Sequence, residues 1–408
     1  MIARALILAT VCLAGASARR SVSEYTINLD LAPEDRFIEA GLLPHFNATV
    51  WKFYNQFFAN DKALTDALDL LVGIRGPEPD EMQREIESLA AASGLPAKFV
   101  QGVQMLYELQ TLMVPIVNFT KKDRSVADDA AFYLPPIAGL EPLARIPWRG
   151  PGCTGIIAAD NSADGNGTVN HARNLDFSPV PIMTDLVYTA KFTKGGKELF
   201  RSQMVAGYQQ TITMYRPGPN GFAIERNTRY SYDKNGNVQM FKNVLGGKPL
   251  NGWQLRKICE THDNYEDAVA AIKAAPYVST EYAIVSGVRK GTILAKAEAA
   301  VEHEQVLGKH NEEQRDDYII ITNFDFWNHD VREYFDPTAG FPKASKHTRR
   351  ITAQMQLNAS AAITRDVLFE TINAPGVLAD TIFQAVINVE HDIWNVSQPC
   401  AFKPTPGC

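Results

Sequence analysis

Two segments near the middle of the chain have the pattern of the two strands of one hairpin. Residues 154–160 are mostly small and β-branched, residues 168–177 have the pattern of a strand that returns beside them, and the stretch between is rich in Gly, Asn and Asp. Antiparallel pairing of these strands would bring Arg173 and Asp176 back beside Cys153. A thiol next to a cation and a carboxylate has the parts of an activated thiolate site, so the pattern predicts a cysteine nucleophile.

The composition is that of an ordinary globular chain. The 408 residues are 45% hydrophobic and 21% charged, enough for one large or two moderate domains. A net charge of −6 and the absence of any basic run argue against a nucleic-acid partner. No motif calls for a metal or another cofactor, and we expect none.

The first 18 residues have the features of a secretory signal peptide. Arg4 precedes an apolar core at residues 5–14, and Ala16-Ser17-Ala18 fits a cleavage site. The apolar core is too short to span a bilayer, although a signal anchor is the alternative. We therefore expect a soluble lumenal or secreted protein. Five Asn-x-Ser/Thr sequons fit this route as glycosylation sites: Asn47, Asn118, Asn166, Asn358 and Asn395.

Cysteine use is sparse for a protein of the secretory route. Cys400 and Cys408 flank a short Pro-containing tail, and a disulfide between them is predicted. Cys259 falls in a helical pattern and is expected to be a buried thiol. Cys153 is then left unpaired in an oxidising compartment, which a catalytic role would explain.

The region before Cys153 is mainly helical. After a strand at residues 24–31, helical spacing is evident at 61–72, 80–92 and 96–114. The last of these is strongly apolar, which predicts a core helix, with a lipid-facing helix as the alternative. Residues 119–152 contain several prolines and several charges, which predicts an exposed linker that ends at a cleavage point.

The region after Cys153 is rich in predicted strands. Turn signals at 194–197 and 234–237 separate some of them, and one helix is expected at 252–274. The remaining strands are expected at 185–193, 198–206, 210–216, 221–231, 281–287, 291–296, 317–323 and 380–389, with helices at 347–357 and 362–373. This order predicts an α+β fold in which two stacked sheets have helices outside.

Several motifs in this order resemble one enzyme family. The similar segments are Cys153-Thr154-x-Ile156, His171-x-Arg173-Asn174-Leu175-Asp176, Ile321-Thr322-Asn323-Phe324-Asp325-x-Trp327 and Arg349-Arg350-Ile351-Thr352-Ala353, together with Tyr25–Asp30, Gly207-Tyr208 and Tyr282–Val285. Together they resemble the acid ceramidase and N-acylethanolamine-hydrolysing acid amidase family of cysteine N-terminal nucleophile hydrolases. The resemblance covers most of the chain from about residue 24.

The resemblance implies an αββα sandwich and a zymogen that cuts itself between Gly152 and Cys153. It implies a signal peptide at 1–18, a mainly helical α-subunit at 19–152 and a catalytic αββα β-subunit at 153–408. The two pieces would stay together as a heterodimer without a disulfide between them. The implied activity is hydrolysis of the amide of an N-acyl lipid, ceramide or N-acylethanolamine, in the lysosome or outside the cell. A membrane surface or lipid micelle would present that substrate.

The resemblance also assigns roles to five residues. Cys153 would be the nucleophile, with its own freed α-amine as general base, so no catalytic histidine is nominated. Arg173 would favour the thiolate, and Asp176 would orient the α-amine. Asn323 would donate its side-chain N–H to the oxyanion, and Arg349 would bind substrate or stabilise Asn323 and Asp176. The alternatives are an ion pair for Arg173 and Asp176, a strand-end cap for Asn323 and a helix salt bridge for Arg349.

Some positions depart from the family pattern. The family's Asn-Glu-Arg corresponds to Asn227-Thr228-Arg229, with Glu225 two residues earlier. Asn227 and Arg229, with Tyr208, remain candidates for contacts with the substrate or the oxyanion. The hairpin after Cys153 and the linker before it are longer than in the family pattern, and residues around 336–343 form an insertion. A non-catalytic lipid-binding or interaction protein is therefore the second interpretation. Bile-acid or penicillin-type amides are a further substrate class, and a thiol protease or transglutaminase-like enzyme is a third interpretation without a paired Cys/His signature.

Overall fold

The computed structural model describes residues 19–109, 152–177, 179–230, 234–309, 315–328 and 348–399, with the backbone alone at 234–237. The predicted signal peptide, most of the linker, Asn118 and the Cys400–Cys408 pair lie outside the described residues.

Two sheets form the centre of the molecule. The first has six strands in the spatial order β1(Arg19–Ser21), β14(Ile393–Pro399), β13(Thr381–Asn388), β4(Thr168–Asp176), β3(Gly152–Asp160) and β12(Tyr318–Ile321). The second has eight strands in the order β11(Val301–Val306), β10(Lys290–Lys296), β9(Glu281–Gly287), β8(Phe222–Thr228), β7(Tyr208–Arg216), β6(Lys197–Val205), β5(Val187–Lys194) and β2(Glu24–Asn28). All of these pairings are antiparallel except β2 with β5.

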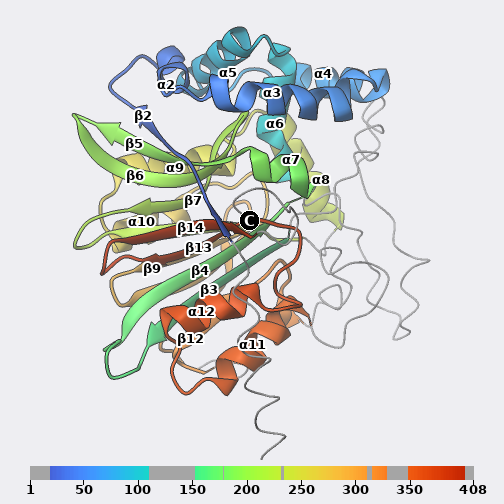
Figure 1. Cartoon of the computed structure of the whole chain (residues 1–408). Helices are drawn as coiled ribbons and strands as arrows, with labels where there is room; N and C mark the ends of the chain where they lie inside the picture. The colour runs from blue at the N-terminus through green and yellow to red at the C-terminus, as the bar shows by residue number, and fades with distance from the viewer. Residues whose placement is uncertain are drawn as a thin grey trace, which may run out of the picture.

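Helices cover the outer face of each sheet. The six-stranded sheet packs against α11(Arg349–Ala359) and α12(Arg365–Asn373), and the eight-stranded sheet packs against α9(Asn251–Thr261) and α10(Tyr265–Ala274). Figure 1 shows the sheets between these helices, with α11 and α12 at the bottom of the view. The arrangement is the αββα sandwich of the predicted fold class, and each sheet buries both faces as such layering requires.

A second group of helices precedes β3 in the chain. It comprises α2(Pro33–Glu39), α3(Leu43–Tyr54), a π-helical turn Asn55–Ala59, α4(Lys62–Arg75), α5(Asp80–Ser93) and α6(Ala97–Leu109). The N-terminal helices lie together at the top of Figure 1. Nearly every side chain of α6 is buried, and the helix contacts β7, so over residues 97–109 it is a core helix and not a lipid-facing one.

The side chains of β3 and β4 alternate between two buried environments. Ile156, Ala158 and Ala172 pack with α11 and α12 on the outer face of the six-stranded sheet. Ile157 and Val169 pack between the two sheets. By this alternation, Cys153 and Arg173 face the space between the sheets.

The sequence predictions of individual elements were wrong in several places. The single helix expected at 252–274 is two helices, because the Asn264 side chain accepts the Asp267 N–H and starts α10 afresh. The turn signal at 234–237 is the start of α8(Lys234–Leu245). The short helix α7(Val180–Asp185) and the strands β1, β11 and β14 were not predicted. Of these, β1 and β11 lie at sheet edges, where polar residues hide the alternation of a strand.

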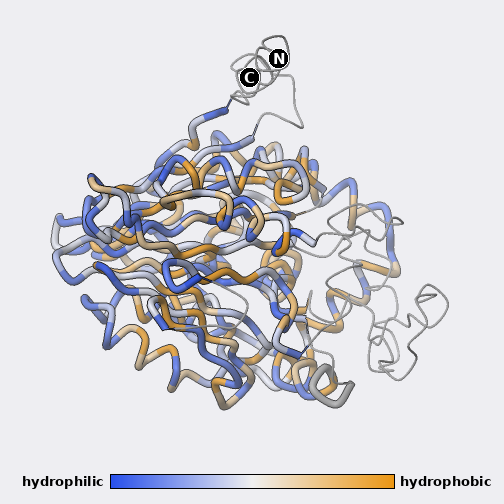
Figure 2. Tube along the Cα trace, turned by 90° about the horizontal axis from the view of Figure 1, so that it is seen from below, coloured by the Kyte–Doolittle hydropathy of each residue, from blue (hydrophilic) through white to orange (hydrophobic). Residues whose placement is uncertain are grey.

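Hydrophobic and hydrophilic residues are interleaved along the traced chain (Figure 2). Within the described ranges, no helix combines the length and the hydropathy needed to cross a bilayer.

Candidate active site

Cys153 is the second residue of β3 and is completely buried. Its sulfur is not in a disulfide. Two groups approach Sγ: Nη2 of Arg173 on the neighbouring strand β4 at 3.7 Å, and the hydroxyl of Tyr107 on α6 at 3.9 Å. The hairpin register pairs Cys153 with Leu175 and Gly152 with Asp176, as the turn chemistry predicted.

The Arg173 side chain is fixed by the eight-stranded sheet. Its guanidinium donates to the carbonyls of Ile212 and Arg226, at 3.2 and 3.4 Å, and to the Thr213 hydroxyl. Glu225 lies 3.9 Å from Nε and supplies the opposite charge. The cation that touches the sulfur therefore cannot move away without breaking its hydrogen bonds to the eight-stranded sheet.

The buried sulfur is a thiol in this state. Burial is the largest influence and raises the pKa of Cys153 to about 11, while the Arg173 charge pulls that pKa down. The Arg173 charge favours the thiolate, which is the predicted direction, but in the uncut chain the cost of burial is larger. A base must take the proton before this sulfur can attack.

Asp176 lies at the end of β4, on the outer face of the sheet. Its carboxylate accepts a hydrogen bond from Thr381 and lies 3.5 Å from Nη1 of Arg349. It is not on the same face as the sulfur, but its backbone is the register partner of Gly152. The carboxylate is thus held next to the predicted scissile bond.

Asn323 and Arg349 both form hydrogen bonds with the backbone of Cys153. Oδ1 of Asn323 accepts the Cys153 N–H at 2.8 Å, and Nη1 of Arg349 donates to the Cys153 carbonyl at 2.6 Å. Nη2 of Arg349 also donates to Oδ1 of Asn323 at 2.7 Å, so two donors fix the orientation of that amide. Its Nδ2 donates to the Thr228 carbonyl at 2.8 Å, and the oxyanion role of Asn323 stays a prediction.

The three remaining candidates have different surroundings. Arg229 is bound by Asp325 at 2.6 Å and anchors the loop that carries Asn323. The Tyr208 hydroxyl accepts from Arg226 at 3.2 Å. Asn227 is fully buried, and neither its amide oxygen nor its amide nitrogen has a hydrogen-bond partner in the structure. Asn227 is therefore the candidate with a free donor to offer.

Sequence reasoning missed three groups around the site. Tyr107 and Thr381 come from distant parts of the chain, and no local motif marks them. Glu225 was noted only because it lies two residues before the position that the family pattern gives a glutamate. In the structure it hydrogen-bonds to Nε2 of His171 at 2.9 Å and lies 3.9 Å from Nε of Arg173. His171 lies on β4 of the six-stranded sheet and Glu225 on β8 of the eight-stranded sheet, so they meet across the space between the sheets, and no strand pairing predicts this contact.

Relatives with curated names match most of the chain. The N-acylethanolamine-hydrolyzing acid amidase of Caenorhabditis elegans is 26% identical over 331 residues, which is 79% of this chain and 79% of that protein. The acid ceramidase of Homo sapiens is 23% identical over 398 residues, which is 92% of this chain and 85% of that protein. Over most of its length, the chain is therefore similar to an N-acylethanolamine-hydrolyzing acid amidase and to an acid ceramidase. No family model matches the sequence.

A solved structure of the Caenorhabditis elegans N-acylethanolamine-hydrolyzing acid amidase ortholog superposes with a TM-score of 0.48 at 23% identity, covering 58% of this chain and 93% of that one.

An apolar pocket lies close to the sulfur. It lies between the N-terminal helices and strands β5, β6 and β7, and its lining includes Phe46, Val50, Phe99, Val103, Tyr107 and Ile212. Cys153 is not part of this lining, but Tyr107 belongs both to the lining and to the surroundings of Sγ. One side chain therefore separates the pocket from the sulfur. Among the described residues, no cluster of His, Cys, Asp or Glu has the make-up of a metal site.

The predicted glycosylation sites within the described ranges differ in exposure. Asn166, Asn358 and Asn395 are exposed, while Asn47 is half-buried on α3 and its Nδ2 donates to the Ser93 carbonyl at 3.3 Å. A glycan attaches to that nitrogen, so Asn47 is the least accessible of these four.

Glycine is required at position 155 by the carboxylate of Glu225. A Cβ at this position would lie 2.8 Å from both carboxylate oxygens, and Glu225 is held in place by His171. Gly155→Ala should therefore lower the free energy of unfolding by about 1–3 kcal/mol, measured by urea denaturation. The matched control is Gly73→Ala on α4, where nothing lies near the new methyl group and no loss is expected. Equal stability of the two variants would contradict this close contact.

A second buried charge cluster fixes the end of α6. Arg226 donates to Glu108 at 2.8 Å and to Glu281, so one cation serves two fully buried carboxylates. Burial, aided by the Glu281 charge, raises the pKa of Glu108 to about 7, although Arg226 opposes the rise. Near neutral pH this carboxyl gains and loses a proton inside the protein.

The raised pKa predicts that the fold is more stable in acid. The folded state binds this proton more tightly than the unfolded chain, so the stabilisation is complete below about pH 4.5 and is lost as the pH rises through about 7. Between pH 5 and pH 8, the wild type should lose on the order of 2 kcal/mol of unfolding free energy relative to Glu108→Gln. Urea denaturation at both pH values measures this. The exposed Glu87→Gln should follow the wild type, and an identical loss in Glu108→Gln would refute the assignment.

Proposed function

We propose that this chain is a self-cleaving amidase that hydrolyses the amide bond of N-acyl lipids, with Cys153 as its nucleophile. One observation carries the proposal: a free, buried sulfur touches a fixed guanidinium, and Tyr107 beside that sulfur lines an apolar pocket. The names of the relatives, an acid ceramidase and an N-acylethanolamine-hydrolyzing acid amidase, agree with this chemistry.

The first reaction is cleavage of the chain itself. Sγ of Cys153 attacks the carbonyl carbon of Gly152, the Gly152–Cys153 C–N bond breaks, and the nitrogen takes the thiol proton to become an α-amine. Water then attacks the resulting thioester, which releases a Gly152 carboxyl group and restores the thiol. The Asn323 and Arg349 contacts to the Cys153 backbone would hold the new N-terminus where it formed.

The second reaction uses the freed α-amine as a base. The amine takes the thiol proton, the sulfur attacks the acyl carbonyl, and the protonated leaving amine departs from a tetrahedral intermediate. Water hydrolyses the acyl thioester to a fatty acid. The Asn323 oxygen, which accepts the Cys153 N–H in the uncut chain, would orient the amine together with Asp176.

The oxyanion needs a donor that is free in the folded chain. Asn227 has an unused buried amide, whereas one of the two amide N–H groups of Asn323 donates to the Thr228 carbonyl. One oxyanion donor is worth about 3 kcal/mol of barrier. We assign this role to Asn227 or to the second N–H of Asn323.

The substrate is an N-acyl lipid because the pocket wall is almost entirely hydrocarbon. The acyl chain would occupy the space between α3, α6 and β7, with its carbonyl at Sγ. Ceramide and N-acylethanolamine share this acyl part and differ in the amine that leaves. After cleavage, the pieces 19–152 and 153–408 would form a non-covalent heterodimer in the lysosome or outside the cell, facing a membrane surface or lipid micelle.

A panel of N-acyl lipids tests the proposal. The secreted protein is held at acidic pH, and the release of fatty acid from ceramide and from N-acylethanolamine is measured by mass spectrometry. Hydrolysis of either supports the amidase and identifies the leaving amine. Tight fatty-acid or lipid binding without hydrolysis would support a non-catalytic lipid-binding protein, and hydrolysis of peptides alone would support a thiol protease.

A further inference from the structure

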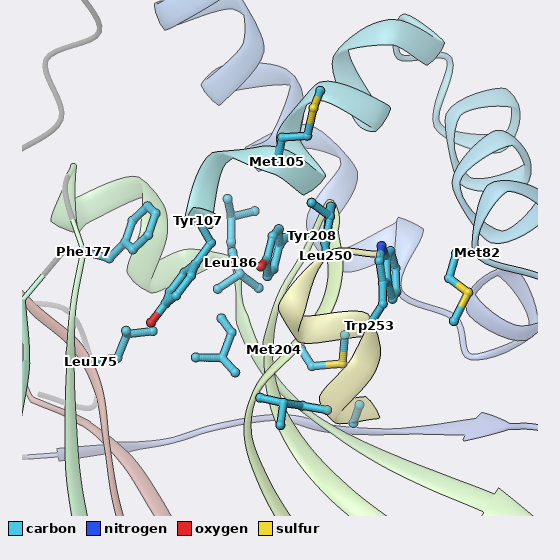
Figure 3. Close-up of a cluster of buried hydrophobic side chains, with 14 of the residues drawn as sticks. Met82, Met105, Tyr107, Leu175, Phe177, Leu186, Met204, Tyr208, Leu250 and Trp253 are labelled. Atoms are coloured by element: carbon cyan, nitrogen blue, oxygen red, sulfur yellow. The ribbon is translucent and has the colours of Figure 1, made fainter. Parts of the chain in front are cut away.

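Among the described residues that precede Cys153 in the chain, Tyr107 contacts the nucleophilic sulfur. It lies on the last turn of α6, before the predicted cleavage point, and its side chain is buried. Its hydroxyl is 3.9 Å from Sγ of Cys153 and donates to the Arg226 carbonyl at 3.0 Å. In Figure 3 the hydroxyl end of Tyr107 points toward Leu175, the register partner of Cys153.

One further contact holds the ring directly, and two others hold the helix that carries it. The Arg226 guanidinium lies over the ring at 4.2 Å from its centroid, and the adjacent Glu108 pairs with the same arginine. One turn earlier on α6, Gln104 donates to the Gly207 carbonyl at 2.9 Å. These bonds fix α6, and with it the position of the phenol.

We propose that Tyr107 is a positioning residue for Cys153, whose hydroxyl turns from the Arg226 carbonyl to the sulfur when the sulfur loses its proton. This inference rests on the proposed role of Cys153 as nucleophile. It means that the N-terminal segment supplies part of the environment of the nucleophile and does not merely cover the pocket.

The chemistry of the two groups supports this assignment. Burial raises the pKa of Tyr107 well above its usual value, so its hydroxyl keeps a proton to donate. A thiolate is a stronger acceptor than a thiol, and a hydrogen bond to a charged acceptor is about twice as strong as one between neutral groups. Arg173 and Tyr107 would then stabilise the anion from two different segments of the chain.

The test measures the reactivity of the thiol, which does not depend on any substrate. The rate of Cys153 alkylation by iodoacetamide is followed by peptide mass spectrometry from pH 5 to pH 9 in the full-length protein, for the wild type and for Tyr107→Phe. The variant keeps the ring and its contact with Arg226 but loses the hydroxyl. Because the thiolate is the reactive form, we expect alkylation about tenfold slower at each pH, equivalent to a pKa about one unit higher.

Tyr277→Phe is the matched control. Tyr277 is also a fully buried phenol, and its hydroxyl has no hydrogen-bond partner in the structure. Loss of the Tyr277 hydroxyl should leave the pH profile of Cys153 alkylation unchanged. Thermal unfolding of both variants separates a loss of packing from a change at the sulfur.

Equal alkylation rates in Tyr107→Phe and the wild type would overturn the proposal. So would a slower rate that Tyr277→Phe shares, since the effect would then come from packing. If Tyr107→Phe slows alkylation while the wild type hydrolyses no N-acyl lipid, the contact with the sulfur stands and the proposed amidase function fails.

Discussion

Replacing Cys153 with alanine should give a single uncut chain that releases no fatty acid from ceramide or N-acylethanolamine. The sulfur is the only group in the proposal that forms a bond to Gly152 or to the substrate. Removing a nucleophile typically lowers kcat by about 10⁴-fold or more. A denaturing gel after acid treatment and a fatty-acid assay measure both losses.

Cys259→Ala is the matched control for this variant. Cys259 is likewise a free, fully buried thiol, but it lies on α9, and burial raises its pKa well above the usual value. The control should be cut and active at the wild-type level. If Cys153→Ala is still cut at the same bond, an external protease makes the cut and self-cleavage is excluded.

Arg349→Met should destabilise the folded chain by about 3–5 kcal/mol, because it leaves buried acceptors without their donor. Arg349 is almost completely buried and serves the Cys153 carbonyl, Asn323 and Asp176 at once. The free energy of unfolding from urea titrations gives the number. Fatty-acid release should also fall, because the Cys153 carbonyl loses its hydrogen bond from Arg349.

Arg289→Met gives the comparison at an exposed ion pair. Arg289 meets Glu390 at 3.0 Å with about half of its side chain in water, so its loss should cost much less stability than the loss of Arg349. Stabilities of Arg349→Met and Arg289→Met that agree within error would contradict the buried network around Cys153.

The sequence predicted the centre of the site because that centre is local. Cys153 and Arg173 are brought together by one hairpin, and hairpin register follows from turn chemistry and from the alternation of side chains. Asn323 lies next to β12, which pairs with β3. For such pairs, sequence spacing and strand pairing together determine the contact.

The rest of the site depends on contacts that no spacing encodes. Tyr107 reaches the sulfur only because α6 packs on the far sheet, and Thr381 reaches Asp176 from a strand more than 200 residues away. The protonation of Cys153 also escaped prediction. The motif contains the cation, but the cost of burial arises from the whole fold.

The most direct measurement is the N-terminal sequence of the larger fragment formed when the purified protein is held at acidic pH. The account predicts a fragment that begins with Cys153, beside a smaller one that ends with Gly152. A larger fragment that begins at any other residue, or a chain that remains whole while it hydrolyses an N-acyl lipid, would contradict it.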